Sequence, residues 1–364
     1  MDKVSPYQGL DARAFWRTGL AETDYPPPDL YRPKWSLSKT DRIVTAGSCF
    51  AQHVGRALRQ NGFNVLDAEP APDGMAPDQA LQHGYNMYSA RYGNLYTTRQ
   101  LRQLIEEAWH GAPWFDAIWE RDGRYYDALR PNIQPNGFPT EMAVADARSA
   151  HLARVREVFS SADVFVFTLG LTEAWTHRST GQVYATAPGT IAGTFDPNVH
   201  CFANFRVAEI RTDLEAALAR LKELNPGLRI LLTVSPVPLT ATASGNHVLP
   251  ATILSKSILR AVAGELAEDF PEVDYFPSYE IVTSTRAGTS FFEDNLRSVR
   301  EAGVARVMST FIRAHLEPTL APVPAEPDRK ALRAQRREAR AAAQDASSGA
   351  GDRKTRRKAN KGRA

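Results

Sequence analysis

The sequence predicts an α/β fold of three layers, in which a mainly parallel sheet carries helices on both faces. Segments of unbroken apolar residues alternate with amphipathic helical patterns, and strands that are apolar throughout are typical of a parallel sheet covered on both sides. We expect this domain to span residues 41–320. An extended arm rich in proline and aromatic residues precedes it at 1–40, and a basic low-complexity tail follows at 325–364.

The expected elements follow one another in an α/β order. In the first half they are a strand at about 42–46, a helix at about 50–61, a short strand at 63–66, a loop-rich stretch at 68–96, a helix capped by Thr97 or Thr98, and a loop-rich insertion at 111–138. In the second half they are a helix at 141–160, a strand at 163–169, a loop with a short hairpin at 176–204, a helix at 206–224, a strand at 229–234, a helix at 251–268, a strand at 273–276 and a helix at about 300–315. The aromatic residues of the insertion are expected to form part of a binding cleft.

Composition excludes several classes of protein. The chain has 364 residues, of which 43% are hydrophobic and 23% charged, and it contains no apolar run of 18 residues that would predict a membrane span. The first residues have no apolar core of a signal peptide, and Cys49 and Cys201 give neither a disulfide framework nor a metal-ligand spacing. We therefore expect a cytoplasmic protein without a metal. Phosphate-loop and dinucleotide motifs are also absent, so no cofactor is expected.

The C-terminal tail differs from the rest of the chain in charge. Residues 325–364 hold 13 basic and 5 acidic residues, a net charge of +8, whereas the remaining body has a net charge of −5. The tail has too few apolar residues to offset the entropy of ordering, although 329–343 has high helix propensity. We expect a solvated extension, with weak binding to anionic surfaces as the alternative.

The strongest candidate site is the turn at Gly47-Ser48-Cys49, between the first strand and the first helix. Glycine permits a sharp turn and close approach of a ligand. Serine at a helix N-terminus lies beside free N–H groups that stabilise the oxyanion of a reacting ester. The alternative interpretation is that Ser48 only caps the helix. Cys49 is either a thiolate at this helix end or a small packing residue.

Other polar residues follow the later strands. Because ligands bind at the carboxyl ends of parallel strands, these segments are expected to converge on Ser48. They are Gly170-Leu171-Thr172-Glu173 after one strand, Ser235 and Asn246-His247 after the next, and Asp294-Asn295-Leu296-Arg297-Ser298 before the last helix. The histidines form no metal-ligand spacing.

Several blocks of the sequence also resemble one bacterial family. They are Gly47-Ser48-Cys49-Phe50-Ala51, Ser5-Pro6-Tyr7 with Phe15-Trp16-Arg17, Tyr92-Gly93-Asn94-Leu95-Tyr96-Thr97, Leu169-Gly170-Leu171-Thr172-Glu173-Ala174-Trp175, Ser235-Pro236-Val237-Pro238 and Ser255-Lys256-Ser257. In their order they resemble the GSCFA family, over about residues 5–315. That family is grouped with the SGNH, or GDSL-like, esterases and acyltransferases. The resemblance implies an SGNH-like, flavodoxin-like fold and, more loosely, acyl transfer.

The resemblance implies roles for individual residues. Ser48 would be the nucleophile, and its own N–H would hold the oxyanion together with Gly93 or Asn94. Where SGNH enzymes have Gly-x-Asn-Asp, this chain has Gly170 to Glu173, without the asparagine. Asp294 matches the aspartate of their Asp-x-x-His pair, but Arg297 stands where the histidine is expected.

Three hypotheses follow from that departure. His247 supplies the base from another strand end, oriented by Glu173 or Asp294, because triads are recognised by geometry and not by order. Alternatively, Glu173 itself is the base. In both cases the protein hydrolyses or transfers an acyl group of an ester, with O-acylated carbohydrate as one substrate class. In the third hypothesis the same site binds an acylated ligand without catalysis. In each case the residues expected to bind the substrate or its oxyanion are Gly47, Cys49, Gly93, Asn94, Gly170, Thr172 and Arg297.

Overall fold

The computed structural model describes residues 5–20, 25–111, 117–287 and 291–316. The chain divides into two compact units, Met1–Leu320 and Ala321–Ala364, and every described helix and strand belongs to the first. The tail predicted at 325–364, including its expected helix, lies outside the described residues.

Four parallel strands form the central sheet, in the order β1-β4-β8-β9. They are β1 (Ile43–Gly47), β4 (Val164–Leu169), β8 (Arg229–Val234) and β9 (Val273–Phe276). Almost every residue in them is buried, as expected for a parallel sheet covered on both faces. The predicted α/β architecture is therefore confirmed.

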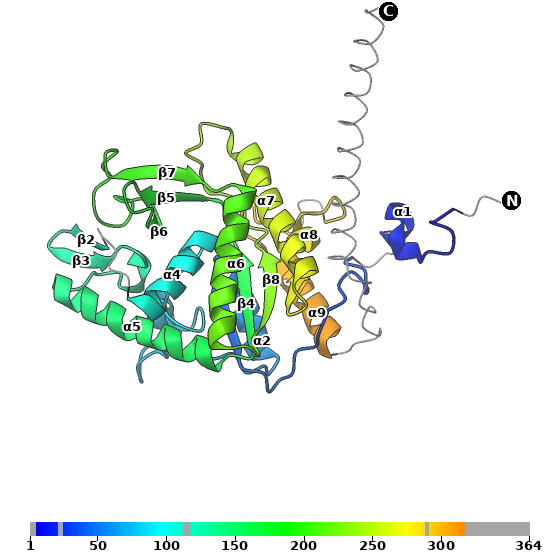
Figure 1. Ribbon diagram of the computed structural model, residues 1–364, viewed down its shortest axis with the longest axis horizontal. Coiled ribbons are helices and arrows are strands. Elements are labelled where there is room, and N and C mark those ends of the chain that lie inside the picture. The colour runs from blue at the N-terminus through cyan, green and yellow to red at the C-terminus, as the bar shows by residue number, and fades with distance from the viewer. Residues whose placement is uncertain (1–4, 21–24, 112–116, 288–290, 317–364) are drawn as a thin grey trace, which may run out of the picture. The chain divides into compact units, whose positions relative to one another are not determined.

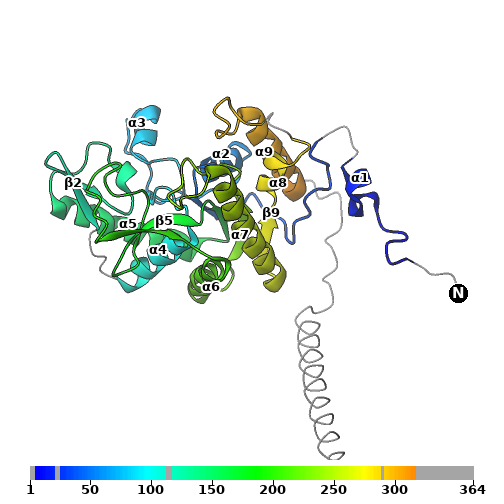
Figure 2. The ribbon, with the colours of Figure 1, turned by 90° about the horizontal axis from the view of Figure 1, so that it is seen from above.

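Two groups of helices cover the two faces of this sheet (Figures 1 and 2). On one face lie α2 (Phe50–Gln60), α8 (Ser278–Thr283) and α9 (Glu301–Leu316); on the other lie α4 (Thr98–His110), α5 (Glu141–Ser161), α6 (Val207–Leu224) and α7 (Val248–Asp269). Successive strand residues point to opposite faces. Thus Ile43 packs in the core under α2 and α9, whereas Val44 packs in the core under α4 to α7.

The strand order creates a crevice beside β1. Val65 pairs in parallel with Ile43 on one side of β1. The short strand predicted at 63–66 is thus reduced to an isolated bridge. β4 pairs with β1 on the other side. The chain therefore leaves β1 in opposite directions, and at such a switch point a ligand-binding crevice opens outside the carboxyl ends of the strands.

Two smaller sheets stand outside the central one. β5 (Glu173–His177), β6 (Val183–Tyr184) and β7 (His200–Asn204) form an antiparallel sheet in the order β6-β5-β7, and β2 (Ile118–Arg121) pairs with β3 (Arg124–Asp127). The sequence predicted only a loop with a short hairpin at 176–204. The segment instead contains β6 and β7, and both strands pair with β5. Short helical turns complete the fold: Ala12–Ala14, α1 (Trp16–Gly19), α3 (Pro77–Gln82) and Pro131–Ile133.

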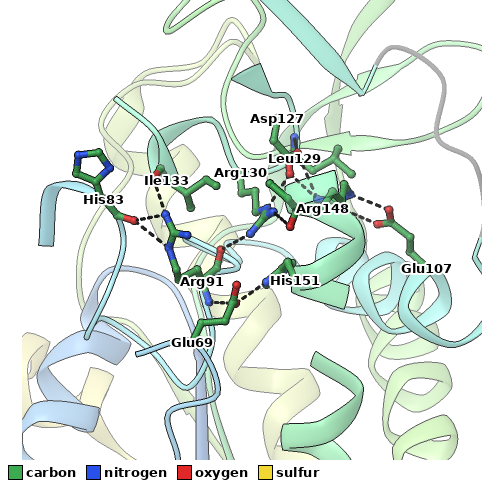
Figure 3. Close-up of polar contacts among 11 residues, drawn as sticks. Glu69, His83, Arg91, Glu107, Asp127, Leu129, Arg130, Ile133, Arg148 and His151 are labelled. Atoms are coloured by element: carbon green, nitrogen blue, oxygen red, sulfur yellow. Dashed lines mark hydrogen bonds and ion pairs between the residues drawn. The ribbon is translucent and has the colours of Figure 1, made fainter. Parts of the chain in front are cut away.

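A buried network of charges joins the described part of the insertion, residues 117–138, to the domain (Figure 3). Arg130 and Arg148 both donate to the Asp127 carboxylate, and Arg148 also pairs with Glu107 of α4. The paired arginines lower the pKa of Asp127 to about 2, against the opposing effect of its burial. The β2–β3 hairpin is thus connected to α4 and α5 by ion pairs, and buried charges are retained because each is paired.

The N-terminal arm contacts the edge of the domain near β9. Tyr25 donates through its hydroxyl to the Ile281 carbonyl at 3.0 Å, and Tyr31 donates to Asp274 at 2.8 Å. Lys34 donates to the carbonyls of Phe270 and Val273. Within the described part of the chain, no helix combines the length and apolar character needed to span a bilayer.

Candidate active site

A cavity of about 480 Å³ opens at the carboxyl ends of β1, β4 and β8. Its lining comes from the turn after β1, the start of β5, the loop after β8, the buried face of α7 and the loop before α9. It therefore occupies the crevice that the strand order creates. Of the residues predicted from the sequence, it is lined by Ser48, Cys49, Gly170, Glu173, Ser235 and Arg297.

The Gly47-Ser48 turn is held against the neighbouring strand. The Ser48 N–H donates to the Thr168 carbonyl at 3.0 Å. Gly47 has φ +135°, and a Cβ there would lie 2.3 Å from the Thr168 oxygen, so no other residue fits. Because that N–H is occupied, Ser48 does not offer it to an oxyanion in this arrangement.

The Ser48 hydroxyl is buried and has no partner. The residue is 3% exposed, and Oγ has no hydrogen bond to any described residue. The residue at the N-cap of α2 is Cys49, and its side chain makes no capping hydrogen bond. The interpretation of Ser48 as a helix cap therefore has no hydrogen bond to support it. A buried hydroxyl without a partner is costly, and such groups in native proteins call for an explanation.

The segment carrying Gly93 and Asn94 lies beside this turn. The Leu95 N–H donates to the Gly47 carbonyl at 2.9 Å. The Tyr88 hydroxyl reaches both the Ser48 carbonyl and Asn94 Oδ1. Neither Gly93 nor Asn94 lines the cavity. The backbone N–H of Cys49, the next residue after Ser48, has no acceptor among the described residues. It is therefore a free hydrogen-bond donor beside Ser48.

Lys256 is the residue of this site that the sequence interpretation missed. It lies on the buried face of α7, is 0% exposed and lines the cavity. Its Nζ donates to the Gly170 carbonyl at 2.7 Å, and the neighbouring Ser255 accepts the Thr172 N–H at 3.0 Å. The signal was present in the sequence: a lysine stands among the mostly apolar positions of one helix face, and a lysine is almost never fully buried unless it is paired.

Glu173 and Thr172 follow Gly170 but face different surroundings. Glu173 lines the cavity, is 7% exposed and accepts a hydrogen bond from the Thr242 hydroxyl at 2.9 Å. Burial raises the pKa of its carboxyl group, and the hydrogen bond from Thr242 opposes that rise. Thr172 is buried and donates to Asn204 Oδ1 at 2.7 Å, so it supports the loop and does not line the cavity.

Arg297 lines the cavity from the loop before α9. The preceding Leu296 has φ +55°, an unusual conformation for leucine, and it is exposed. Arg297 Nε is buried, and it has no hydrogen-bond partner among the described residues. The residue that departs from the expected Asp-x-x-His pair is therefore a guanidinium in the cavity wall.

His247 and Asp294 lie outside the cavity lining. His247 is exposed, and its Nδ1 accepts the Leu249 N–H at 3.1 Å, which caps α7. Asp294 is fully exposed and pairs with Arg300 at 3.0 Å. The expected convergence thus brings together Ser48, Glu173 and Arg297, and it does not place these two residues with them.

Within the described ranges, no three His, Cys, Asp or Glu side chains gather as metal ligands would. No curated protein matches the chain. The GSCFA family model matches residues 42–311, a range that runs from the start of β1 into α9 and contains the whole cavity. The match covers well over half of the sequence, and the chain belongs to the GSCFA family.

Proposed function

We propose that this protein is an SGNH-like esterase or O-acyltransferase in which Ser48 is the nucleophile. The observation that carries the proposal is the Ser48 hydroxyl, which is buried at the cavity, at the switch point of the sheet, without a hydrogen-bond partner among the described residues. A hydroxyl free of competing hydrogen bonds is available to a base and to a substrate.

The surroundings of Ser48 suit a reacting acyl ester. Attack of Oγ on the carbonyl carbon places negative charge on the carbonyl oxygen, beside the N-terminus of α2 and the unpaired Cys49 N–H. Trp175, Tyr184 and Phe202 contribute aromatic surface to the cavity. Aromatic surface with a few polar groups favours a small acyl ester, and we take O-acylated carbohydrate as the first substrate class to test.

A non-catalytic ligand-binding protein is the second candidate. The position of His247 and Asp294 outside the cavity lining favours it, because a serine without a base is a poor nucleophile. The two candidates make opposite predictions for Ser48→Ala.

The test compares two buried serines with p-nitrophenyl acetate and butyrate as probes. Ser48→Ala should lower hydrolysis at least 10³-fold and leave the melting temperature unchanged or slightly raised, because its hydroxyl makes no hydrogen bond. Ser89 is the matched control, since its Oγ accepts the Thr45 N–H at 2.9 Å and it does not line the cavity. Ser89→Ala should lower stability by about 1–3 kcal/mol and spare activity. Equal activity in Ser48→Ala and wild type would favour the binding protein.

Cys49 and Cys201 are both free thiols. Unpaired cysteines are typical of a reducing compartment, which supports a cytoplasmic location.

A further inference from the structure

The site contains a buried lysine that has no carboxylate partner among the described residues. Lys256 is 0% exposed, and no described aspartate or glutamate forms an ion pair with it. A buried ammonium is normally paired, and an unpaired one is strongly disfavoured relative to the neutral amine. The Gly170 carbonyl, 2.7 Å from Nζ, is a neutral acceptor and serves the amine as well as the ammonium.

Gly170 brings this amine next to Ser48. The carbonyl of Gly170 accepts from Lys256, while a Cβ built on Gly170 would lie 2.9 Å from the Ser48 Cβ. The lysine nitrogen and the serine thus contact the same residue, and both line the same cavity. A base must reach its proton directly or through one water, and the two side chains approach the same glycine in one cavity.

We propose that Lys256 is the general base that activates Ser48, so that a Ser–Lys pair takes the place of the missing histidine. This proposal rests on the function proposed above. In the first step, Ser48 Oγ forms a bond to the acyl carbon as its proton moves to the neutral Lys256 amine. The ammonium then gives that proton to the departing alkoxide. In the second step, water or an acceptor hydroxyl loses a proton to Lys256 and attacks the acyl-enzyme, and the ammonium returns the proton to Ser48.

The charged and titratable groups around Lys256 agree with a neutral amine. Burial lowers the pKa of Lys256 to about 7; the nearby Cys49 opposes this shift, and Arg297 adds to it. Tyr96 and Glu173 also line the cavity, and burial raises the pKa of both, to about 12 for Tyr96, so Tyr96 carries no charge at neutral pH. Among the described residues, Lys256 is the one lysine that lines this cavity.

The first experiment measures p-nitrophenyl acetate hydrolysis by full-length variants. Lys256→Met and Lys256→Arg should each lose at least 10²-fold, because neither side chain accepts a proton at neutral pH. Lys34→Met is the matched control: Lys34 also donates to backbone carbonyls, but it lies outside the cavity lining, so full activity is expected. Lys256→Ala should regain activity with added ethylamine, which a structural role for Lys256 would not produce.

The second experiment follows pH. Wild-type activity should rise through about pH 7, so that at pH 6 it is about tenfold below its plateau. Arg297→Gln should move this rise to higher pH, because the guanidinium charge disfavours the ammonium. The ¹³Cε chemical shift of Lys256 in the inactive Ser48→Ala protein should titrate in the same range.

The outcomes separate the two proposals. If Ser48→Ala is inactive while Lys256→Met keeps the wild-type rate, Lys256 is not the base and the proposed function stands. If Lys256→Met does not fold, the ¹³Cε chemical shift of Lys256 in the Ser48→Ala protein decides. A shift typical of an ammonium up to pH 9 would overturn the inference. If Ser48→Ala is as active as wild type, the proposed function itself fails.

Discussion

Gly170 is the residue on which the geometry of the site depends. It follows β4 directly, its carbonyl accepts from Lys256, and its N–H donates to the Tyr96 carbonyl. A Cβ at this position would lie 2.9 Å from both the Ser48 Cβ and the Tyr96 oxygen. Glycine is required here because three segments of the chain approach one another closely.

Gly170→Ala should therefore damage both stability and activity. We expect a loss of about 1–3 kcal/mol from overpacking, and a larger proportional loss of hydrolysis because Ser48 and Lys256 are pushed apart. Urea unfolding and ester hydrolysis measure the two effects. Gly227→Ala is the matched control, since the nearest atom to its Cβ is 3.8 Å away. A Gly170→Ala protein as stable and active as wild type would contradict this account of the site.

How far the site could be predicted depended on where each residue lies. Ser48, Glu173 and Arg297 follow or precede regular elements, so strand ends alone bring them to one edge. Lys256 lies within a helix, where a lysine is expected on the solvated side, and only the packing of α7 against the Gly170 loop shows its position. His247 follows β8 by a dozen residues, and a loop of that length does not determine where its side chain lies.

At the scale of elements, the core strands were predictable and the outer sheets were not. β4 and β8 are mostly apolar and almost entirely buried, which is typical of strands in a sheet covered on both faces. β5 and β7 are only partly buried and carry polar residues, and β5 pairs with β7 about 25 residues later. Their stability comes from pairing with each other, which a pattern within one segment does not reveal.

The charge network around α5 gives a prediction about acid stability. His151 of α5 is buried against Glu69 at 2.6 Å, and burial lowers the pKa of His151 to about 4; Arg130 adds to the shift and Glu69 opposes it. The unfolded chain binds a proton near pH 6.5, whereas the folded protein does so only near pH 4. The contribution of His151 to the free energy of unfolding is therefore fully present above pH 6.5, and it is lost as the pH decreases toward 4.

Through His151 alone, the free energy of unfolding should decrease by on the order of 2 kcal/mol between pH 7 and pH 4.5. In His151→Gln the urea midpoint should fall less over this interval than in wild type. His315, whose pKa burial also lowers to about 4, supplies a second and independent part of the wild-type loss. His110→Gln, at an exposed histidine, should retain the full pH dependence. An unchanged dependence in His151→Gln would show that the folded protein does bind this proton.

At the scale of the whole molecule, the folded unit and the tail are expected to be independent. The family match ends at residue 311, within α9, and the second compact unit begins at Ala321. Residues 325–364 carry a net charge of +8 with few apolar side chains, which offer little burial to stabilise a core.

Truncation after residue 322 should leave the unfolding transition and ester hydrolysis unchanged. Any affinity of the full chain for anionic vesicles should fall steeply with salt and vanish on truncation, because it would be electrostatic. Calorimetry and vesicle sedimentation at two salt concentrations measure these effects. A truncated protein that melts much earlier would show that the tail packs on the domain.

The central claim, that Ser48 is a nucleophile in a working acyl-transfer site, is tested most directly by covalent labelling. A fluorophosphonate reacts with an activated serine, and intact-mass measurement counts the groups added. We expect one group on wild type, located at Ser48 by peptide mapping, and none on Ser48→Ala. An unlabelled wild-type protein, or equal labelling of Ser48→Ala, would contradict the claim.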